Sequence, residues 1–323
     1  MNALALTPQQ PLPGNVTAKQ ITNSILMIEP VAFGFNHQTA VNNYFQQKEV
    51  GAENDIQDRA YAEFTSMVAK LRANGVNVLV VKDTEQPHTP DSIFPNNWIS
   101  FHEGGQVVLY PMFARNRRWE RRNDILQLIE DKGSIVNNVD DFTFWEEQNK
   151  FLEGTGSMVL DRVHRVAYAA LSERTNKSLF LQFCKVFDLK PIHFSANQTV
   201  EKKRLPIYHT NVMMCIASEY AVVCLESIDS EKEYRTVVDS LISLGKEIIT
   251  ISEKQMHNFA GNMLQVENAD GSQFLVMSQS AYDSLNQFQI YRLNTYNELI
   301  VVEIPTIEKI GGGGVRCMMA EIF

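Results

Sequence analysis

The C-terminal stretch of the sequence combines a glycine run with a cysteine. Residues 311–314 are all glycine, and Val315, Arg316 and Cys317 follow them. Glycine lets the backbone adopt positive φ angles and lie very close to a ligand. A cysteine reacts through its thiolate, and a neighbouring cation or histidine lowers the pKa that controls this form. Cys317 is therefore a candidate nucleophile, although the same residues also fit a glycine loop that leads into a strand with a small buried thiol.

Four other polar residues stand in segments that are otherwise apolar or rich in glycine. They are Asn97, Glu153, His209 and Asn262. A histidine is the most frequent acid or base in catalysis near neutral pH, and a carboxylate can orient it. Each residue also has a simpler explanation, since a histidine that begins an apolar strand is often a satisfied core residue, and glutamates and asparagines are common in turns. A joint role requires that the fold bring them together.

The composition argues against several other classes of function. The 323-residue chain has a net charge of −9, with 44% hydrophobic and 21% charged residues, which is ordinary for a globular protein. The negative charge disfavours nucleic-acid binding, which needs clustered Lys and Arg. No apolar run approaches the ~20 residues of a membrane span. Cysteines stand at 184, 215, 224 and 317 without a regular spacing, so a reducing cytoplasm is expected rather than a disulfide framework or a zinc site.

A pattern of helix followed by strand repeats along the chain. Helical periodicity is found in residues 55–73, 117–132, 176–188, 231–244 and 284–293. Strands that follow these helices begin near residues 76, 134, 190, 246 and 298, and further strands are expected at 24–29, 98–102 and 107–112. A repeat of roughly 55 residues is typical of propellers and solenoids. We therefore predict an α/β fold in which five pseudo-symmetric ββαβ-type units close into a propeller.

The candidate residues occupy similar positions in these units. Asn97, Glu153, His209, Asn262 and Cys317 each follow the helix of their unit at a similar distance. In a closed ring, equivalent positions of successive units converge on the central axis. The repeat thus predicts one pocket that holds a thiol, an imidazole, a carboxylate and carboxamides, a set suited to nucleophilic and acid–base catalysis.

At these motifs the sequence resembles the guanidino-group-modifying superfamily, which includes arginine deiminases, dimethylarginine dimethylaminohydrolases and amidinotransferases. The resemblance covers nearly the whole chain and implies the five-unit α/β propeller that these enzymes share. Its most specific motifs are residues 91–97 (DSIFPNN), 153–156 (EGTG) and 171–176 (LSERTN), together with His209 and the glycine–cysteine loop. Within the superfamily, the sequence looks most like the citrulline-utilisation branch.

The resemblance implies a role for individual residues. By this likeness Cys317 is the nucleophile, His209 the acid and base, and Glu153 the charged companion of the histidine. Arg174 is implied to bind a substrate carboxylate, which suits a guanidinium because it can form two parallel hydrogen bonds. The same likeness assigns to substrate binding Asp91, Phe94, Asn97 and Asn211.

Two positions depart from the pattern of the superfamily. Members that bind a guanidinium have an aspartate where this chain has Asn97, and arginine deiminases have another where it has Asn211. A buried guanidinium without a counter-charge costs several kcal/mol. An asparagine can both donate to and accept from a neutral ureido group. The two residues therefore favour a citrulline-type substrate, although Asp91 and Glu153 remain candidate counter-ions for a cation.

The sequence thus predicts a cytoplasmic, cysteine-dependent hydrolase that cleaves a C–N bond in the ureido or guanidino group of an arginine-like amino acid. Residues 1–20 are expected to form a flexible tail and residues 21–323 a single catalytic domain. We expect a small amino-acid ligand, no metal or other cofactor, and no nucleic-acid or membrane partner. The sequence does not decide whether the chain forms a homo-oligomer. The alternatives are a dimethylarginine or arginine hydrolase, an amidinotransferase and, outside the enzymes, a propeller-fold binding protein.

Overall fold

The structure is a computed structural model that describes residues 18–49 and 53–323. It has a mixed α/β fold. In this part of the chain the strands form five three-stranded sheets and one two-stranded hairpin. In each three-stranded sheet the middle strand pairs antiparallel with one neighbour and parallel with the other. Most of the expected N-terminal tail, residues 1–17, lies outside the described residues.

The elements follow the repeating order that the sequence predicts. The strands are β1 (Ser24–Glu29), β2 (Asn77–Lys82), β3 (Ile99–His102), β4 (Gln106–Leu109), β5 (Asn138–Asp141), β6 (Val159–Asp161), β7 (Val166–Ala170), β8 (Lys190–Phe194), β9 (Asn197–Val200), β10 (Lys203–Pro206), β11 (Met214–Ile216), β12 (Tyr220–Val223), β13 (Glu247–Thr250), β14 (Leu264–Glu267), β15 (Gln273–Ser278), β16 (Glu298–Val302) and β17 (Ala320–Ile322). The α-helices are α1 (Glu53–Ala73), α2 (Asn123–Asp131), α3 (Gly154–Ser157), α4 (Lys177–Val186), α5 (Thr210–Met213), α6 (Glu231–Ser243), α7 (Glu253–Met256), α8 (Gln279–Ser284) and α9 (Gln287–Asn294).

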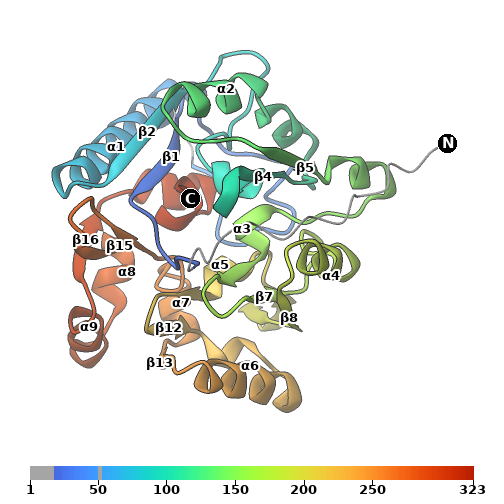
Figure 1. Cartoon of the computed structure of the whole chain (residues 1–323), viewed down its shortest axis with the longest axis vertical. Coiled ribbons are helices and arrows are strands. Elements are labelled where there is room, and N and C mark those ends of the chain that lie inside the picture. Colours follow the sequence, from blue (N-terminus) through green and yellow to red (C-terminus); the bar gives the residue numbers. More distant parts are fainter. Residues whose placement is uncertain (1–17, 50–52) are drawn as a thin grey trace.

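A helix joins the two parallel strands of each three-stranded sheet. Parallel strands need such a crossover because the chain must return from the end of one strand to the start of the next, at the opposite end of the sheet. The connecting helices α1, α2, α4, α6 and α9 lie at the outside of the molecule (Figure 1). Gly75 and Gly245 follow α1 and α6 with φ angles of 81° and 74°, the conformation that commonly ends a helix at a glycine.

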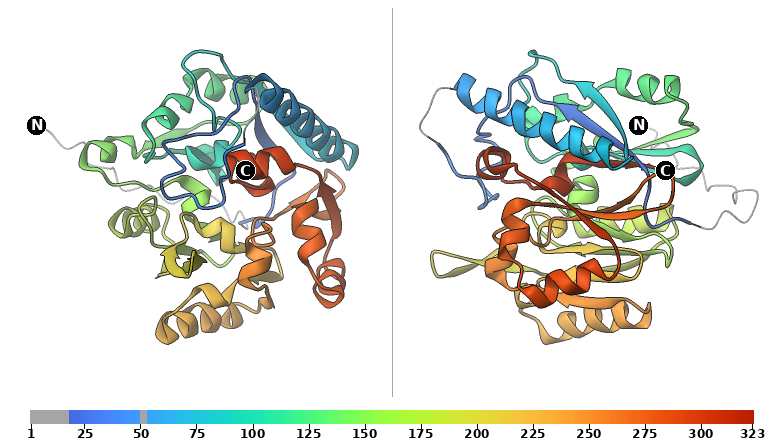
Figure 2. Two further views of the ribbon diagram at one scale, coloured as in Figure 1. Left: turned by 180° about the vertical axis from the view of Figure 1, so that it is seen from behind. Right: turned by 90° about the vertical axis from the view of Figure 1, so that its left-hand side faces the viewer.

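The last strand of the chain completes the first sheet. β17 pairs antiparallel with β1, with Leu26 opposite Ala320 and Ser24 opposite Ile322. It takes the place on β1 that β3 takes on β4, so all five sheets have the same strand arrangement. The sheets follow one another around the middle of the molecule in chain order, and the C-terminus lies inside this outline (Figures 1 and 2).

Three local predictions differ from the structure. The predicted helix 117–132 is a 3-10 helix, Arg115–Glu120, followed by α2, because the Arg117 side chain is bound in the interior and the backbone is extended at Arg122. The predicted strand at 134 begins at Asn138 instead, as the mostly exposed edge strand β5, whose single apolar residue, Val139, makes no pattern that the sequence could reveal. His209 precedes the one-turn helix α5 and not a strand, and β11 follows that turn.

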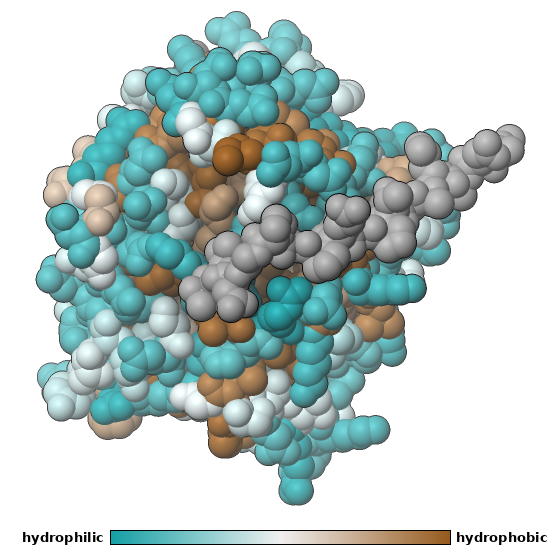
Figure 3. All heavy atoms as spheres, viewed as in Figure 1, coloured by the Kyte–Doolittle hydropathy of each residue, from teal (hydrophilic) through white to brown (hydrophobic). Residues whose placement is uncertain are grey.

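Helices cover the sheets with one apolar face. In α1 the residues Ala60, Phe64, Met67 and Leu71, which share one face at helical spacing, are buried against strands of the sheet. The described surface in Figure 3 is mostly hydrophilic at its rim, with hydrophobic residues visible in a hollow near the middle. Among the helices of the described residues, none is both long and apolar enough to span a membrane.

Candidate active site

One cavity contains most of the residues that the sequence singles out. Three of its walls come from segments that precede the first strand of a sheet: the turn before β3, the turn before α5 and β11, and the 3-10 helix Val315–Met318 before β17. The predicted site residues that line it are Asp91, Phe94, Asn97, Arg174, His209 and Cys317. The cavity therefore joins predicted site residues that are up to 226 positions apart, from 91 to 317.

Cys317 is almost wholly buried, with 3% of its surface exposed. Two carboxamides approach its sulfur: Asn262 Nδ2 lies 3.4 Å and Asn211 Nδ2 lies 3.5 Å from Cys317 Sγ. Burial raises the pKa of the Cys317 thiol, and the hydrogen bonds from Asn262 and Asn211 and the charge of Arg316 only partly oppose this. The neighbouring arginine thus does not suffice to lower the pKa, and Cys317 is a protonated thiol in the free protein at neutral pH.

His209 is held by a carboxylate on one side and faces the cavity on the other. Its Nε2 lies 2.7 Å from Glu153 Oε2, and its Nδ1 is buried without a hydrogen-bond partner among the described residues. Since Glu153 can only accept, this contact assigns the Nε2 hydrogen and leaves the Nδ1 lone pair without a donor among the described residues. Burial lowers the pKa of His209 to about 4, because the hydrogen bond that His209 donates to Glu153 does not fully offset it. The imidazole is therefore neutral at pH 7.

Glu153 lies behind the histidine and does not line the cavity. It has no exposed surface, and its Oε1 accepts a hydrogen bond of 2.9 Å from the backbone of Phe113. Arg174 Nη1 lies 3.6 Å from its Oε2. Burial raises the pKa of Glu153, but Arg174 and the hydrogen bond to His209 outweigh this and lower the pKa to about 2. The carboxylate therefore stays ionised beside the neutral imidazole.

Two glycines allow side chains that line the cavity to come close to the backbone. A Cβ atom on Gly156 would lie 2.7 Å from His209 Nδ1 and 2.5 Å from Asn97 Nδ2. A Cβ atom on Gly313 would lie 2.9 Å from the Phe94 ring. Such distances are shorter than van der Waals contact, so any side chain here would displace the groups that line the cavity. The close approach to the backbone that the sequence predicts for the glycine loop is thus also found at the EGTG motif.

Asp91 carries an oxygen that has no partner. Its Oδ2 accepts hydrogen bonds from Asn36 Nδ2 (2.8 Å) and Thr39 Oγ1 (3.1 Å). Its Oδ1 is buried without a hydrogen bond among the described residues. Burial raises the pKa of Asp91, against the opposing charge of Arg117. Asp91 Oδ1 and His209 Nδ1 are thus two unpaired polar atoms on residues that line the same cavity.

Arg117 is a cavity residue that the sequence reasoning missed. Its Nη1 donates to Asn97 Oδ1 (2.7 Å), so the amide oxygen of Asn97 is already engaged. The guanidinium also donates to both oxygens of Glu120, at 2.9 Å each. The basic cluster 115–122 predicts a charged surface helix, and only the three-residue spacing of Arg117 and Glu120 hints at a buried pair.

The donors of Arg174 are bound by the segment that precedes α1. Its Nε and Nη2 donate to Asn42 Oδ1 at 2.8 and 2.6 Å, and Nη2 also donates to the carbonyl of Thr39 at 2.7 Å. The same segment donates from Asn43 to the carbonyl of Gly312 at 3.2 Å. In the left view of Figure 2 this segment, in blue, crosses the central region. A substrate carboxylate at Arg174 would have to replace some of these bonds.

Asn211 and Asn262 lie beside Cys317 but do not line this cavity. Asn211 follows His209 in the turn of α5, and its side chain lines a second cavity behind Cys317. Asn262 Oδ1 accepts from the backbone nitrogen of Arg316 at 3.0 Å, which fixes the loop that carries Cys317. The described residues contain no cluster of three or more His, Cys, Asp or Glu side chains that could hold a metal ion.

Solved structures of known proteins share this fold. Apo ArgZ, an arginine dihydrolase from the ornithine–ammonia cycle in cyanobacteria, has 17% identity and a TM-score of 0.69 over 93% of this chain and 40% of that chain. The N-terminal domain of ArgZ, bound to product, has 19% identity and a TM-score of 0.69 over 93% and 97%. DDAH from Pseudomonas aeruginosa, a Cys-to-Ser mutant in complex with citrulline, has 16% identity and a TM-score of 0.63 over 94% and 99%. No curated protein matches the sequence.

The fold and the sequence motifs together define a member of the guanidino-group-modifying superfamily. A family model for eukaryotic N,N dimethylarginine dimethylhydrolase matches residues 29–323. The chain belongs to this family, and it is a hydrolase of C–N bonds other than peptide bonds. The alternative of a non-catalytic binding protein is thereby set aside. The chain spans about two fifths of full-length ArgZ, and identities below 20% with ArgZ and the bacterial DDAH establish the fold alone.

Proposed function

We propose that the chain hydrolyses the ureido group of a citrulline-like amino acid through a covalent intermediate on Cys317. In this reaction two water molecules are consumed overall, and the products are ornithine, ammonia and bicarbonate. His209 carries protons between the thiol, the departing nitrogen and the attacking water, while Glu153 orients and polarises the imidazole. The substrate lies in the cavity between Cys317 and the arginines Arg174 and Arg117.

The observation that carries this proposal is the charge of the cavity wall. Among the residues that line the cavity, the guanidiniums of Arg117 and Arg174 are each paired with a glutamate behind the wall, Glu120 and Glu153, and Asp91 is the one lining carboxylate. The amide oxygen of Asn97 accepts from Arg117 and adds no negative charge. A substrate that is neutral at its reacting end can contact this carboxamide, whereas a guanidinium finds no carboxylate at that position and depends on Asp91 for its counter-charge. The cavity therefore suits a ureido group better than a guanidino group.

The first chemical step joins Cys317 to the substrate. Because burial keeps Cys317 protonated and His209 neutral in the free protein, the thiol proton passes to His209 Nδ1 as the sulfur attacks the ureido carbon. The imidazolium that forms is stabilised by Glu153, whose oxygen lies 2.7 Å from Nε2. His209 then gives the proton to the nitrogen that joins the ureido carbon to the side chain, this C–N bond breaks, and ornithine leaves a carbamoyl group on the sulfur. In the second step His209 takes a proton from water, whose oxygen attacks the carbon, and the C–S bond breaks as the thiol regains its proton. The carbamate that is released then reacts with the second water to give ammonia and bicarbonate.

The other end of the substrate is bound by positive charge and apolar contact. Arg174 is the proposed partner of the α-carboxylate, since a carboxylate can replace Asn42 Oδ1 and the Thr39 carbonyl as acceptor of its two donors. Phe94 contributes an aromatic wall beside the glycine loop. Asn211 is proposed to act on the sulfur and not on the substrate directly, because its side chain lines the other cavity.

We further propose that residues 21–323 form one catalytic domain whose five units close into a five-fold α/β propeller. The identical strand arrangement of the five sheets supports this, as does the pairing of β17 with β1, which joins the two ends of the chain in one unit. A closed ring explains why the turns before β3, β11 and β17 contribute to one cavity.

A second candidate is an arginine or methylarginine as substrate. The unpartnered, buried Asp91 Oδ1 favours it, since a carboxylate oxygen at the cavity wall can accept a hydrogen bond from a guanidinium. Family membership and the arginine dihydrolase activity of ArgZ also favour it. An amidinotransferase would additionally need room for an amine acceptor beside Cys317.

The experiment that separates these candidates measures products. Purified protein is incubated with citrulline, arginine, dimethylarginine or agmatine, and ornithine, ammonia, methylamines and citrulline are quantified. The proposal expects ornithine and ammonia from citrulline, with the highest kcat/KM of the four. Faster formation of citrulline from arginine or dimethylarginine, with no turnover of citrulline, would refute the ureido substrate and support the second candidate.

A further inference from the structure

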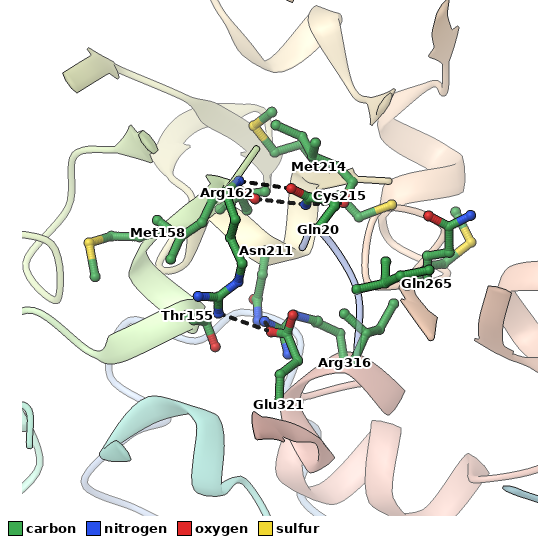
Figure 4. Close-up of a pocket in the computed structure, with 16 residues that line it drawn as sticks. Gln20, Thr155, Met158, Arg162, Asn211, Met214, Cys215, Gln265, Arg316 and Glu321 are labelled. Carbon is green, nitrogen blue, oxygen red and sulfur yellow. Dashed lines mark hydrogen bonds and ion pairs between the residues drawn. The ribbon is translucent and has the colours of Figure 1, made fainter. Parts of the chain in front are cut away.

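A second cavity lies directly behind the nucleophile. It is lined by residues that include Thr155, Arg162, Asn211, Arg316 and Glu321 (Figure 4). Arg316 and Cys317 are adjacent in sequence, yet Arg316 lines this rear cavity while Cys317 lines the front one. Asn211 also lines the rear cavity, and its Nδ2 is 3.5 Å from Cys317 Sγ. One carboxamide therefore separates the rear cavity from the reactive sulfur.

The rear cavity carries an excess of positive charge. Arg316 Nη2 lies 2.6 Å and Arg162 Nη2 lies 3.9 Å from the same oxygen of Glu321. Within the described residues, neither arginine has another carboxylate within 4.0 Å. The other polar partner of Arg162 is His102, whose pKa is lowered well below its usual value by burial and by that arginine, so His102 adds no charge of its own. Two guanidiniums thus share one carboxylate.

Burial and the apolar walls of the rear cavity limit which ligands can compensate its excess positive charge. The side chains of Arg316 and Glu321 are at most 9% exposed and that of Arg162 is 11% exposed, so bulk water screens the cluster poorly. The remaining walls include methionines and other apolar side chains, so an extended or highly charged ligand would lose hydration without replacing it. A small planar oxyanion matches the space and the geometry of guanidinium groups.

We propose that the rear cavity binds a small planar oxyanion of the carbonate class, bicarbonate or carbamate, between Arg162 and Arg316. That this anion is also the one-carbon product of the enzyme rests on the proposed function, in which the ureido carbon leaves as carbamate or bicarbonate. An anion bound there lies behind Asn211, and its negative charge disfavours the thiolate of Cys317. The site therefore links the product of the reaction to the reactivity of the nucleophile.

Binding is tested on the whole protein with ¹³C-labelled bicarbonate, observed by NMR against chloride at equal ionic strength. Wild-type protein should bind bicarbonate saturably. Arg162→Met removes the excess charge and should weaken binding roughly 10- to 100-fold, the size of a lost charge-assisted hydrogen bond. Glu321→Gln raises the excess charge and should strengthen binding. Arg235→Met, which changes a side chain that is 71% exposed on α6, is the matched control and should bind like wild type.

The two charge variants move in opposite directions, so a loss of folding cannot imitate the result. Binding that is absent in wild type, or equal in wild type, Arg162→Met and Glu321→Gln, overturns the site. Binding in the front cavity would also be insensitive to Arg162→Met, and that outcome counts against the proposal.

Coupling to the nucleophile is read without turnover. Iodoacetamide labelling of Cys317 is followed by peptide mass spectrometry, which separates it from Cys215 in the rear cavity. Bicarbonate should slow labelling roughly threefold or more, the change that half a pKa unit produces, and Arg162→Met should abolish this effect. An unchanged rate overturns the coupling. Bicarbonate binding in a protein that does not hydrolyse citrulline would refute the proposed substrate but leave the anion site standing.

Discussion

His209 Nε2 and Glu153 Oε2 lie 2.7 Å apart, in a pair of which 1% and 0% of the side chains are exposed. This contact leaves His209 Nδ1 as the only nitrogen of the ring that can exchange a proton with a ligand in the cavity. It also places a permanent negative charge behind an imidazole that burial keeps neutral. The catalytic role that we propose for His209 depends on this relationship.

The pH dependence of activity should reflect the lowered pKa of His209. Because neutral His209 must accept the thiol proton, kcat/KM should fall as pH decreases through about 4, and not near the usual histidine value. Activity should therefore be retained at pH 5 to 6, measured as initial rates with a stability control at each pH. An acidic limb centred near pH 6.5 would show that His209 is not held neutral by burial.

Glu153→Gln should lower kcat by roughly 100-fold or more, because the imidazolium formed during attack loses its counter-charge. Since Glu153 raises the pKa of His209, its neutralisation should also move the acidic limb of the pH profile to lower pH. Glu231→Gln, at a side chain that is 73% exposed, is the matched control. A lower rate without any shift of the limb would indicate a structural role alone.

Asn97→Asp should change the substrate preference. The new carboxylate would keep the contact with Arg117, now 2.7 Å from Asn97 Oδ1, and would add a negative charge to the cavity wall. Turnover of citrulline should fall and that of arginine or methylarginine should rise, shifting the ratio of kcat/KM roughly 10- to 100-fold. Both substrates are measured on the same protein, so a general loss of stability leaves the ratio unchanged. An unaltered ratio would contradict the role of Asn97.

Gly156→Ala should reduce kcat roughly tenfold or more, since the added methyl would lie 2.7 Å from His209 Nδ1 and overpacking costs about 1–3 kcal/mol. Gly34→Ala is the matched control, because nothing lies within 4 Å of the position where its Cβ would be. Thermal unfolding of both variants separates a displaced histidine from general destabilisation. Full activity of Gly156→Ala would mean that His209 tolerates displacement.

The order of the elements was readable from the sequence because it depends on local patterns. The apolar face of α1 and the β-branched run of β2 have clear periodicities, and the repeated order predicted which turns carry Asn97, His209 and Cys317. The roles of those residues stay proposals.

Other features depend on contacts between distant residues. Arg117 looks like a surface charge until its bonds to Asn97 and Glu120 are seen, and no pattern in the sequence indicates that Thr39 and Asn42 bind Arg174. The hydrogen-bond partners of these two arginines lie up to 135 positions away in the sequence.

Cys317, the proposed nucleophile, differs from the other three thiols in its place in the cavity. Burial raises the pKa of Cys184 and Cys215 to about 12 and that of Cys224 to about 11, and none of these three lines the front cavity. The most direct test of the account is to quench wild-type protein with acid during turnover of citrulline and to analyse its peptides by mass spectrometry. We predict a carbamoyl-type adduct on Cys317 alone, absent from Cys317→Ser. An adduct on another residue, or one that forms on Cys317 with arginine but never with citrulline, would contradict it.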